Sequence, residues 1–129
     1  VDYAFRKEAI HLVHKALDLG VNFFDTAPVY GNGSSELRLG KAFAAIDRSK
    51  LVINSKFGRL VDGSVDFSAK HLTATVEGSL SRLGIDYLDS VIIHSPPFAF
   101  LDGRNQEHYA ILDRLKEDDL HLCFKIQCH

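Results

Sequence analysis

Amphipathic helical stretches alternate with short apolar runs along this chain of 129 residues, and this alternation restricts its fold more than any other feature. Ile10, Val13 and Leu17 recur at the spacing of one helix face, and Gly20 follows where a left-handed residue ends a helix. The apolar run at residues 21–25 then predicts a buried strand. Strands that alternate with helices pair in parallel through right-handed crossovers, so we expect an α/β fold with a parallel sheet.

The same alternation continues to the C-terminal tail. The predicted elements after residue 25 are a helix at 34–46, a strand at 51–55, a helix at 69–83, a strand at 87–93, a helix around 109–115 and one more strand in the tail at 120–129. We expect Ser34 or Ser35 to cap the first of these helices. Ser68 should cap the second helix, which Gly84 should end.

Composition and charge exclude several classes of protein. Hydrophobic residues make up 46% of the chain and charged residues 25%, the balance of one soluble globular domain. The formal net charge of −2 provides no basic surface for nucleic acid or anionic lipid. No apolar run is long enough to span a bilayer, and the N-terminal residues lack the pattern of a secretory signal. We therefore expect a cytoplasmic protein that binds neither nucleic acid nor membrane.

Polar side chains stand at or just beyond the ends of three predicted strands. Asp25 ends the first strand, Lys56 follows the second and His94 follows the third. Tyr30 lies in the loop after Asp25. The carboxyl ends of parallel strands meet at one edge of the sheet, where chemistry gathers in α/β folds. We therefore expect these four side chains to lie together.

Such a set can transfer a proton while a hydride moves. A free tyrosine has a pKa of about 10 and is a poor proton donor at neutral pH, but a nearby ammonium group favours its phenolate. Lys56 supplies that ammonium group, Asp25 keeps it charged and in place, and His94 bonds to the substrate oxygen. Tyr30 then gives a proton to a carbonyl oxygen as hydride reaches the carbon, or takes one from an alcohol in the reverse direction.

The segments that carry these residues resemble a known family. GVNFFDTAPVYG with Asp25 and Tyr30, SKFG with Lys56 and IIHSPP with His94 are similar to segments of the aldo-keto reductase family. The resemblance implies a (β/α)8 TIM barrel and an NADP(H) cofactor, with NAD as the alternative. It implies reduction of aldehydes, ketones or open-chain sugars, or the reverse oxidation. It also implies that Tyr30 is the proton donor, that Lys56, His94 and Asp25 assist it, and that Asp25 and Thr26 lie near the nicotinamide ribose.

The resemblance covers residues 9 to about 118, whereas a whole barrel needs about 250 residues. It implies a partial barrel domain at residues 1–118 with about four parallel strands, lacking strand one and strands six to eight, and a divergent tail at 119–129. In the resembled family, the loops after the last strands bind most of the cofactor's phosphates and adenine. We therefore expect an inactive fragment that self-associates through its open sheet edges. The run KFGRLVDGSVDFSA favours the aldose dehydrogenase branch of the family.

Each of these residues taken alone also has a plainer interpretation. Asp25 with Thr26 shapes a turn, Tyr30 packs in a loop, Lys56 lies on the surface, and His94 is a partly buried side chain with ordinary partners. All of these interpretations must hold together to remove the functional one.

Other functions also stay open. The first is a non-catalytic interaction or regulatory protein, because the resembled family includes channel-associated subunits. The second is a flavodoxin-like open sheet, although no phosphate-cradling loop follows the first strand. Four metal-type side chains near the C-terminus lack the spacing of a zinc finger, and the two cysteines are too few for a disulfide framework. These four are His121, Cys123, Cys128 and His129.

Overall fold

The computed structural model describes residues 2–104, 106–117 and 123–127, which form an α/β fold around one parallel sheet. The strands are β1 (Phe23–Asp25), β2 (Val52–Phe57), β3 (Ser90–His94) and β4 (Cys123–Gln127), and they lie side by side in chain order. The helices are α1 (Asp2–Asp18), α2 (Ser34–Phe43), α3 (Ala69–Leu83) and α4 (Gln106–Glu117), with the short 3-10 helices η1 (Arg48–Lys50) and η2 (Phe98–Leu101). All adjacent strands pair in parallel, which confirms the predicted fold class.

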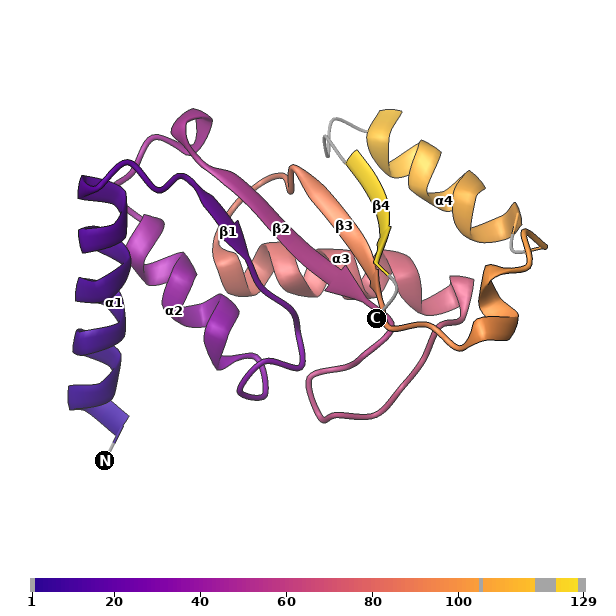
Figure 1. Ribbon diagram of the computed structural model, residues 1–129, viewed down its shortest axis with the longest axis horizontal. Coiled ribbons are helices and arrows are strands. Elements are labelled where there is room, and N and C mark those ends of the chain that lie inside the picture. The colour runs from indigo at the N-terminus through magenta and orange to yellow at the C-terminus, as the bar shows by residue number, and fades with distance from the viewer. Residues whose placement is uncertain (1, 105, 118–122, 128–129) are drawn as a thin grey trace.

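The helices follow the strands in order along the sheet (Figure 1). α1 and α4 lie at opposite ends of the arrangement, and α3 runs behind β2 and β3. Consecutive helices pack on one another, α1 on α2, α2 on α3 and α3 on α4. This is the arrangement of consecutive βα units along a parallel sheet.

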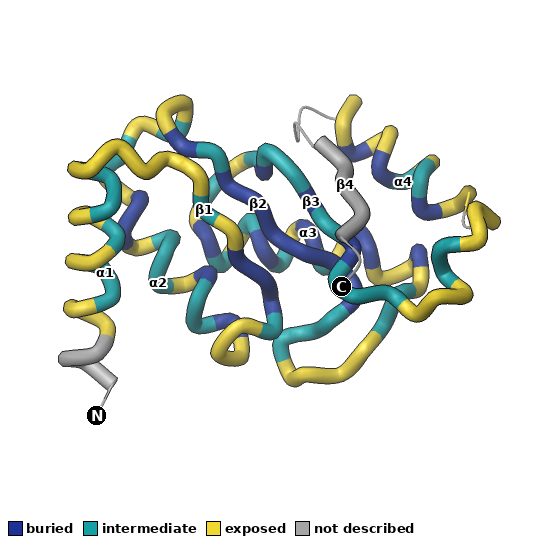
Figure 2. Tube along the Cα trace, viewed as in Figure 1, coloured by how far each residue is buried: buried dark blue, intermediate teal, exposed yellow. Residues whose placement is uncertain are grey.

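The core lies between the sheet and the helices. Ile53 and Phe57 from β2, with Val91 and Ile93 from β3, are at most 2% exposed. Figure 2 shows buried residues concentrated along β2 and on the helices behind it, with exposed residues in the loops and on the outer helices. Because side chains alternate across a strand, Asn54 and Lys56 on β2 and Ile92 on β3 point to the other face of the sheet.

That other face, which we call the inner face, carries polar residues. Parallel pairing sets Asp25 beside Asn54 and Asn54 beside Ser90, so these three share one face. Lys56 lies two residues beyond Asn54 and His94 four residues beyond Ser90, which places both on the same face. The topology therefore gathers polar side chains from three strands on one surface.

The prediction of a buried strand at residues 21–25 is wrong in two respects. Only Phe23–Asp25 form β1, and Phe23 is 55% exposed. Phe24 points the other way and packs edge-on against Phe43, with ring centres 4.9 Å apart. β1 is the first strand in the sheet order, so among the described strands only β2 pairs with it. An edge position with an open inner face leaves alternate side chains accessible, whereas a central parallel strand buries both sets.

The predicted helix ends hold in part. Gly84 ends α3 with a left-handed φ of 65°, as predicted. The predicted capping of α2 by Ser34 or Ser35 is wrong, because Gly33 holds the N-cap position with a φ of 83° and no side chain bonds there. The Ser35 hydroxyl bonds instead to the loop that precedes the helix. Ser68 stands at the N-cap of α3, but its side chain makes no capping hydrogen bond.

The other predicted elements lie close to their expected positions. The strand predicted at 51–55 extends to Phe57, so Lys56 lies inside β2 and not beyond it. The strand predicted at 87–93 begins later and includes His94, and the tail contains β4. Within the described part of the chain, no helix combines the length and apolar character needed to cross a membrane.

Candidate functional site

Asp25 and Lys56 form the centre of the candidate site. Asp25 pairs with Asn54 across the sheet, so Lys56 stands one side-chain repeat further along β2 on the same face. Lys56 Nζ donates to Asp25 Oδ2 at 2.5 Å and to the Thr26 carbonyl oxygen at 3.0 Å. The Lys56 side chain is 2% exposed and that of Asp25 is 43% exposed. The interpretation of Lys56 as a surface lysine is therefore wrong, since its ammonium group is buried and paired with a carboxylate that reaches solvent.

Tyr30 and His94 lie against this pair. Lys56 Nζ is 4.8 Å from the centre of the Tyr30 ring, within the range of a cation–π contact. The ring centres of Tyr30 and His94 are 5.7 Å apart, with the ring planes at 86°. Tyr30 is 39% exposed, so part of its ring faces solvent. Four side chains from three strand ends and one loop therefore lie at one end of the inner face.

A loop with three consecutive left-handed residues carries Tyr30. Gly31, Asn32 and Gly33 have φ angles of 57°, 52° and 83°. The Tyr30 N–H and C=O both make hydrogen bonds within the loop and the start of α2. The left-handed φ at Gly31 favours glycine, and a Cβ atom there would also force the Ser34 hydroxyl to turn away. The loop can therefore turn back over the strand ends within a few residues.

The chain turns sharply directly after His94. Ser95 has a φ of 48°, in the left-handed region that residues other than glycine rarely adopt. Pro96 and Pro97 follow, and neither can donate to a strand ladder. Local strain of this kind is concentrated at functional sites. The turn ends β3 at the point where the half-buried His94 ring meets Tyr30.

Thr26 contributes to the site through its backbone. Its side chain is fully buried, and Thr26 Oγ1 lies 2.9 Å from Ser35 Oγ at the start of α2. Its carbonyl oxygen accepts the hydrogen bond from Lys56 Nζ. The hydroxyl is therefore engaged with α2, while the carbonyl oxygen helps to hold the ammonium group.

Asn54 and Ser90, which the sequence reasoning missed, lie beside Asp25. Asn54 is fully buried, and its Nδ2 donates to Asp25 Oδ1. Its Oδ1 accepts a hydrogen bond from the Ser90 hydroxyl at 2.5 Å. The signal in the sequence was an amide inside the apolar run LVINS, because an amide buried without partners costs free energy.

A second acid–base pair lies on the opposite face of β2. Glu36 is fully buried and accepts from Arg82 Nε at 2.6 Å and from Ser55 Oγ at 2.7 Å. These contacts connect α2, α3 and β2. We call Glu36 with Arg82 the outer pair, and Asp25 with Lys56 the inner pair.

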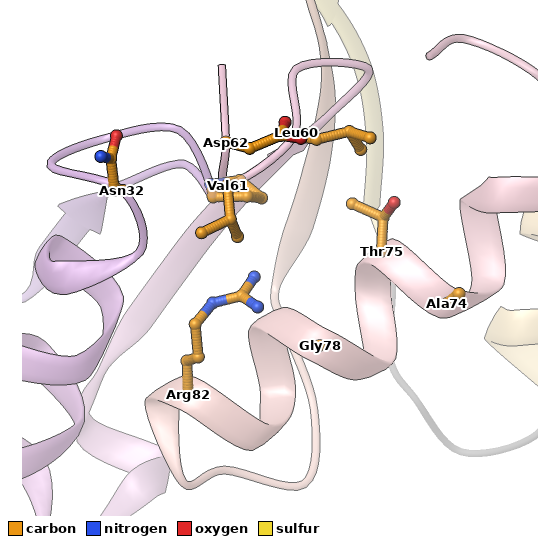
Figure 3. Close-up of a pocket in the computed structure, with 9 residues that line it drawn as sticks. Asn32, Leu60, Val61, Asp62, Ala74, Thr75, Gly78 and Arg82 are labelled. Carbon is orange, nitrogen blue, oxygen red and sulfur yellow. The ribbon is translucent and has the colours of Figure 1, made fainter. Parts of the chain in front are cut away.

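A cavity of about 470 Å³ lies on the helix side of the sheet, between α3 and the loop that follows β2 (Figure 3). Figure 3 shows Val61 from the loop and Thr75 and Arg82 from α3 around it. The Ser64 hydroxyl and N–H donate to Asp62 at its mouth and hold the pKa of that carboxyl below its usual range. None of the four clustered side chains lines this cavity, which adjoins the outer pair.

No group of three or more histidine, cysteine or acidic side chains is placed to hold a metal ion in the part of the chain that the structure describes. His121, Cys128 and His129 lie outside the described residues. The argument against a zinc finger at the C-terminus therefore stays a prediction.

Comparison with known proteins gives a consistent match over most of the chain. A family model described as the aldo/keto reductase family matches residues 3–118. The L-galactose dehydrogenase of Arabidopsis thaliana is 39% identical over 113 residues, which cover 86% of this chain and 35% of that protein. A Schizosaccharomyces pombe protein named for a voltage-gated potassium channel subunit beta is 41% identical over 88 residues, covering 64% of this chain and 26% of that protein. The chain thus spans about a third or less of the length of these relatives.

Solved structures with high similarity share the fold. An aldo-keto reductase from Pseudomonas aeruginosa matches with a TM-score of 0.81 at 39% identity, covering 95% of this chain and 49% of that chain. An aldo-keto reductase from Klebsiella pneumoniae in complex with NADPH matches with a TM-score of 0.75 at 25% identity, covering 96% of this chain and 40% of that chain. These neighbours are TIM barrels, so the prediction of a partial barrel of parallel strands is confirmed.

Proposed function

This chain belongs to the aldo/keto reductase family, a family of oxidoreductases, and on that premise we propose that Asp25, Tyr30, Lys56 and His94 form a site for hydride transfer between a nicotinamide cofactor and a carbonyl or alcohol. The observation that carries the proposal is the burial of the Lys56 ammonium group between the Asp25 carboxylate and the Tyr30 ring. Lysine is almost never fully buried unless it is paired. Here the paired Lys56 ammonium group also lies close to the Tyr30 ring, which is partly exposed to solvent.

Each side chain has one task in this proposal. Tyr30 donates its phenolic proton to the substrate carbonyl oxygen and accepts one in the reverse reaction. Lys56 stabilises the negative charge that develops on the phenolic oxygen, since its Nζ lies 4.8 Å from the ring centre. Asp25 holds the ammonium group in place through the 2.5 Å bond. His94, edge-on to Tyr30, bonds to the substrate oxygen.

The cofactor we propose is NADP(H), with NAD(H) as the alternative, and it supplies or accepts the hydride when bound. The residues present fit its ribose in part. Asp25 keeps 43% of its side chain exposed, so its carboxylate can accept a hydrogen bond from a ribose hydroxyl. The Thr26 hydroxyl is buried against Ser35, so we assign it no ribose contact. The similar aldo-keto reductase from Klebsiella pneumoniae is described in complex with NADPH, which supports this choice of cofactor.

The substrate class we propose is an aldose or a related small carbonyl compound. Relatives with sugar-related names are the L-galactose dehydrogenase, a 6-dehydroglucose reductase from Novosphingobium aromaticivorans and a D-threo-aldose 1-dehydrogenase from Pseudomonas. In this chain, the exposed side of Tyr30 next to His94 provides polar groups for a substrate oxygen. A hydroxylated carbonyl compound suits such a site better than an apolar one.

Turnover that depends on Tyr30 tests the proposal. The four described strands do not enclose the site, and water excluded from a site strengthens its electrostatic effects, so we propose that the chain alone is inactive or nearly so. The chain at high concentration is incubated with NADPH and a panel of aldehydes and aldoses, and product is measured by mass spectrometry. Tyr30→Phe is the matched control, because it removes only the phenolic oxygen.

The two proteins together give a clear result. Trace product from the chain and none from Tyr30→Phe supports the site. Equal product from both contradicts the role of Tyr30. No product from either, with a shift in NADPH emission on mixing, agrees with a cofactor site in an inactive chain, whereas unchanged NADPH emission contradicts the cofactor site.

A non-catalytic interaction or regulatory role is the second candidate. The similarity to a protein named for a potassium channel subunit beta favours it. Phe23, 55% exposed at the edge strand, provides an apolar contact for another chain. A partner that binds the chain and Tyr30→Phe equally, but not Phe23→Lys, would support this role over the catalytic one.

A further inference from the structure

We propose that Asn54, supported by Ser90, is a positioning residue that holds the Asp25 carboxylate towards Lys56. The inference rests on the hydride-transfer site proposed above and adds a residue to it. The feature that carries it is a row of three side chains on the inner face, in which the register pairs Asp25 with Asn54 and Asn54 with Ser90.

Asn54 stands where a buried parallel strand ordinarily carries an aliphatic side chain. It is fully buried in the central part of the described sheet, between β1 and β3. A buried amide costs free energy unless both of its ends find partners. Asn54 finds one on each neighbouring strand, Asp25 on β1 and Ser90 on β3. An apolar residue would fill the same space without this requirement, so the amide needs an explanation beyond packing.

The chemistry of the partners fixes the direction of the amide. An ionised carboxylate only accepts hydrogen bonds, so the Asn54 NH₂ group must face Asp25. The Asn54 carbonyl oxygen then faces β3, where the Ser90 hydroxyl donates to it at 2.5 Å. Ser90 therefore gives the carbonyl end of the amide a donor, while the acceptor-only carboxylate sets the direction of the amide. The Ser90 hydroxyl and the Asn54 NH₂ group both donate in the direction of Asp25. This alignment of donors stabilises the negative charge of the Asp25 carboxylate.

The two oxygens of Asp25 are consequently divided between two residues of β2. Asn54 holds Oδ1 and Lys56 holds Oδ2. The torsion that orients a carboxylate group is broad, and the Asp25 side chain is 43% exposed. With only Lys56 as a partner, the carboxylate could turn towards water. Asn54 removes that freedom, so that Oδ2 stays on the ammonium group that faces Tyr30.

A role in packing alone makes a different prediction. If Asn54 only filled space, an apolar residue of similar size would leave the Lys56 ammonium group as it is. Ser55, the next residue on β2, provides a matched control, because its hydroxyl bonds to Glu36 on the opposite face. Ser55→Ala disturbs the same strand without touching the row on the inner face.

The hydrogen exchange of the Lys56 ammonium group is the test, measured by NMR on the chain with ¹⁵N-labelled lysine. A buried, hydrogen-bonded ammonium group exchanges slowly enough to give its own signal, which Lys56→Arg identifies by its loss. We expect Asn54→Leu to speed this exchange about tenfold, in line with the loss of one buried hydrogen bond. Ser90→Ala should have a smaller effect, and Ser55→Ala none.

An Lys56 exchange rate in Asn54→Leu that equals that of the original chain overturns the proposal. A rate raised equally by Asn54→Leu and Ser55→Ala also overturns it, because it indicates general loosening of β2. If Asn54→Leu does not fold, Asn54→Ser takes its place, since serine is too short to reach Asp25. The Tyr30→Phe comparison is independent of these results, so the positioning role can fail while the proposed function stands.

Discussion

The two faces of β2 each bury one acid–base pair, but they bury opposite partners. In the outer pair the Glu36 side chain has no exposed surface, and that of Arg82 is 22% exposed. In the inner pair the Lys56 side chain is 2% exposed, and that of Asp25 is 43% exposed. Ser55, which bonds to Glu36, is the neighbour of Lys56 in the sequence. Alternation along one strand thus directs consecutive residues to two different electrostatic environments.

The outer pair joins α2, α3 and β2, whereas the inner pair places a charged group beside solvent, where a ligand can reach it. The Glu36 side chain has no exposed surface, and its two carboxylate oxygens bond to Arg82 and Ser55, so no ligand can reach them. In the inner pair the acid remains accessible, and the buried ammonium group faces an exposed phenol. We infer that the outer pair serves the packing of α2 and α3 on the sheet and that the inner pair serves chemistry.

Removal of Arg82 should have the largest effect on stability. Arg82→Met leaves the Glu36 carboxylate buried without its cation, so we expect the free energy of unfolding to fall by about 3 kcal/mol, measured by urea denaturation. The double variant Glu36→Leu with Arg82→Met is the control and should recover most of this loss. A single variant within about 0.5 kcal/mol of the original chain would show that the outer pair does not serve packing.

Removal of the Tyr30 hydroxyl should affect turnover and not stability. We expect Tyr30→Phe to lower any turnover of the chain by about 100-fold, because general acid catalysis contributes roughly two to four orders of magnitude. The midpoint of urea unfolding should barely change, since the ring keeps its contacts. Steady-state rates beside the denaturation curve check both parts, and a large loss of stability would mean that Tyr30 acts mainly in packing.

The inner pair should show the reverse asymmetry to the outer pair. Asp25→Ala leaves the ammonium group of Lys56 buried without a counter-ion, and we expect a loss of about 2 kcal/mol in the free energy of unfolding. Lys56→Met leaves only a carboxylate that water can reach, so about 1 kcal/mol or less should be lost. Urea denaturation of the two variants side by side decides the order. If Lys56→Met proved the more damaging, the contrast between the two pairs would be refuted.

The smallest effect on stability is expected at Phe23. Phe23→Lys replaces an exposed apolar side chain on the edge strand, so the free energy of unfolding should change by no more than about 0.5 kcal/mol. Self-association should nevertheless decrease, because a charge on an edge strand opposes pairing with another chain. Size-exclusion chromatography with light scattering measures this. A chain that is already monomeric before the substitution would contradict self-association through the open sheet edge.

The element order was predictable because it depends on local patterns. The spacing of Ile10, Val13 and Leu17 and the left-handed end at Gly84 involve residues within one helix or next to it. The capping of α2 was not predictable in this way. Ser35 has the chemistry of a cap, but its hydroxyl bonds to Thr26, and that choice depends on how the preceding loop folds.

The candidate site shows the same division. Asp25, Lys56 and His94 could be chosen from their positions at the ends of apolar runs, and Tyr30 from its place in the loop after the first run. The burial of Lys56 and the contacts of Asn54 could not, because they depend on the register between strands that lie 29 or more residues apart in the chain. Glu36 is the clearest example. In the sequence it is an acidic residue in the first turn of a helix, where acids are common, but in the folded protein it is fully buried.

The sequence by itself determined the alternating architecture, the order of the four clustered side chains along the chain and the membership of the family. Only the tertiary structure decided which member of each acid–base pair is buried and which groups bond to Asp25. The physical reason is that periodicity and turn chemistry act over a few residues, whereas the burial of a charge depends on every segment that packs around it.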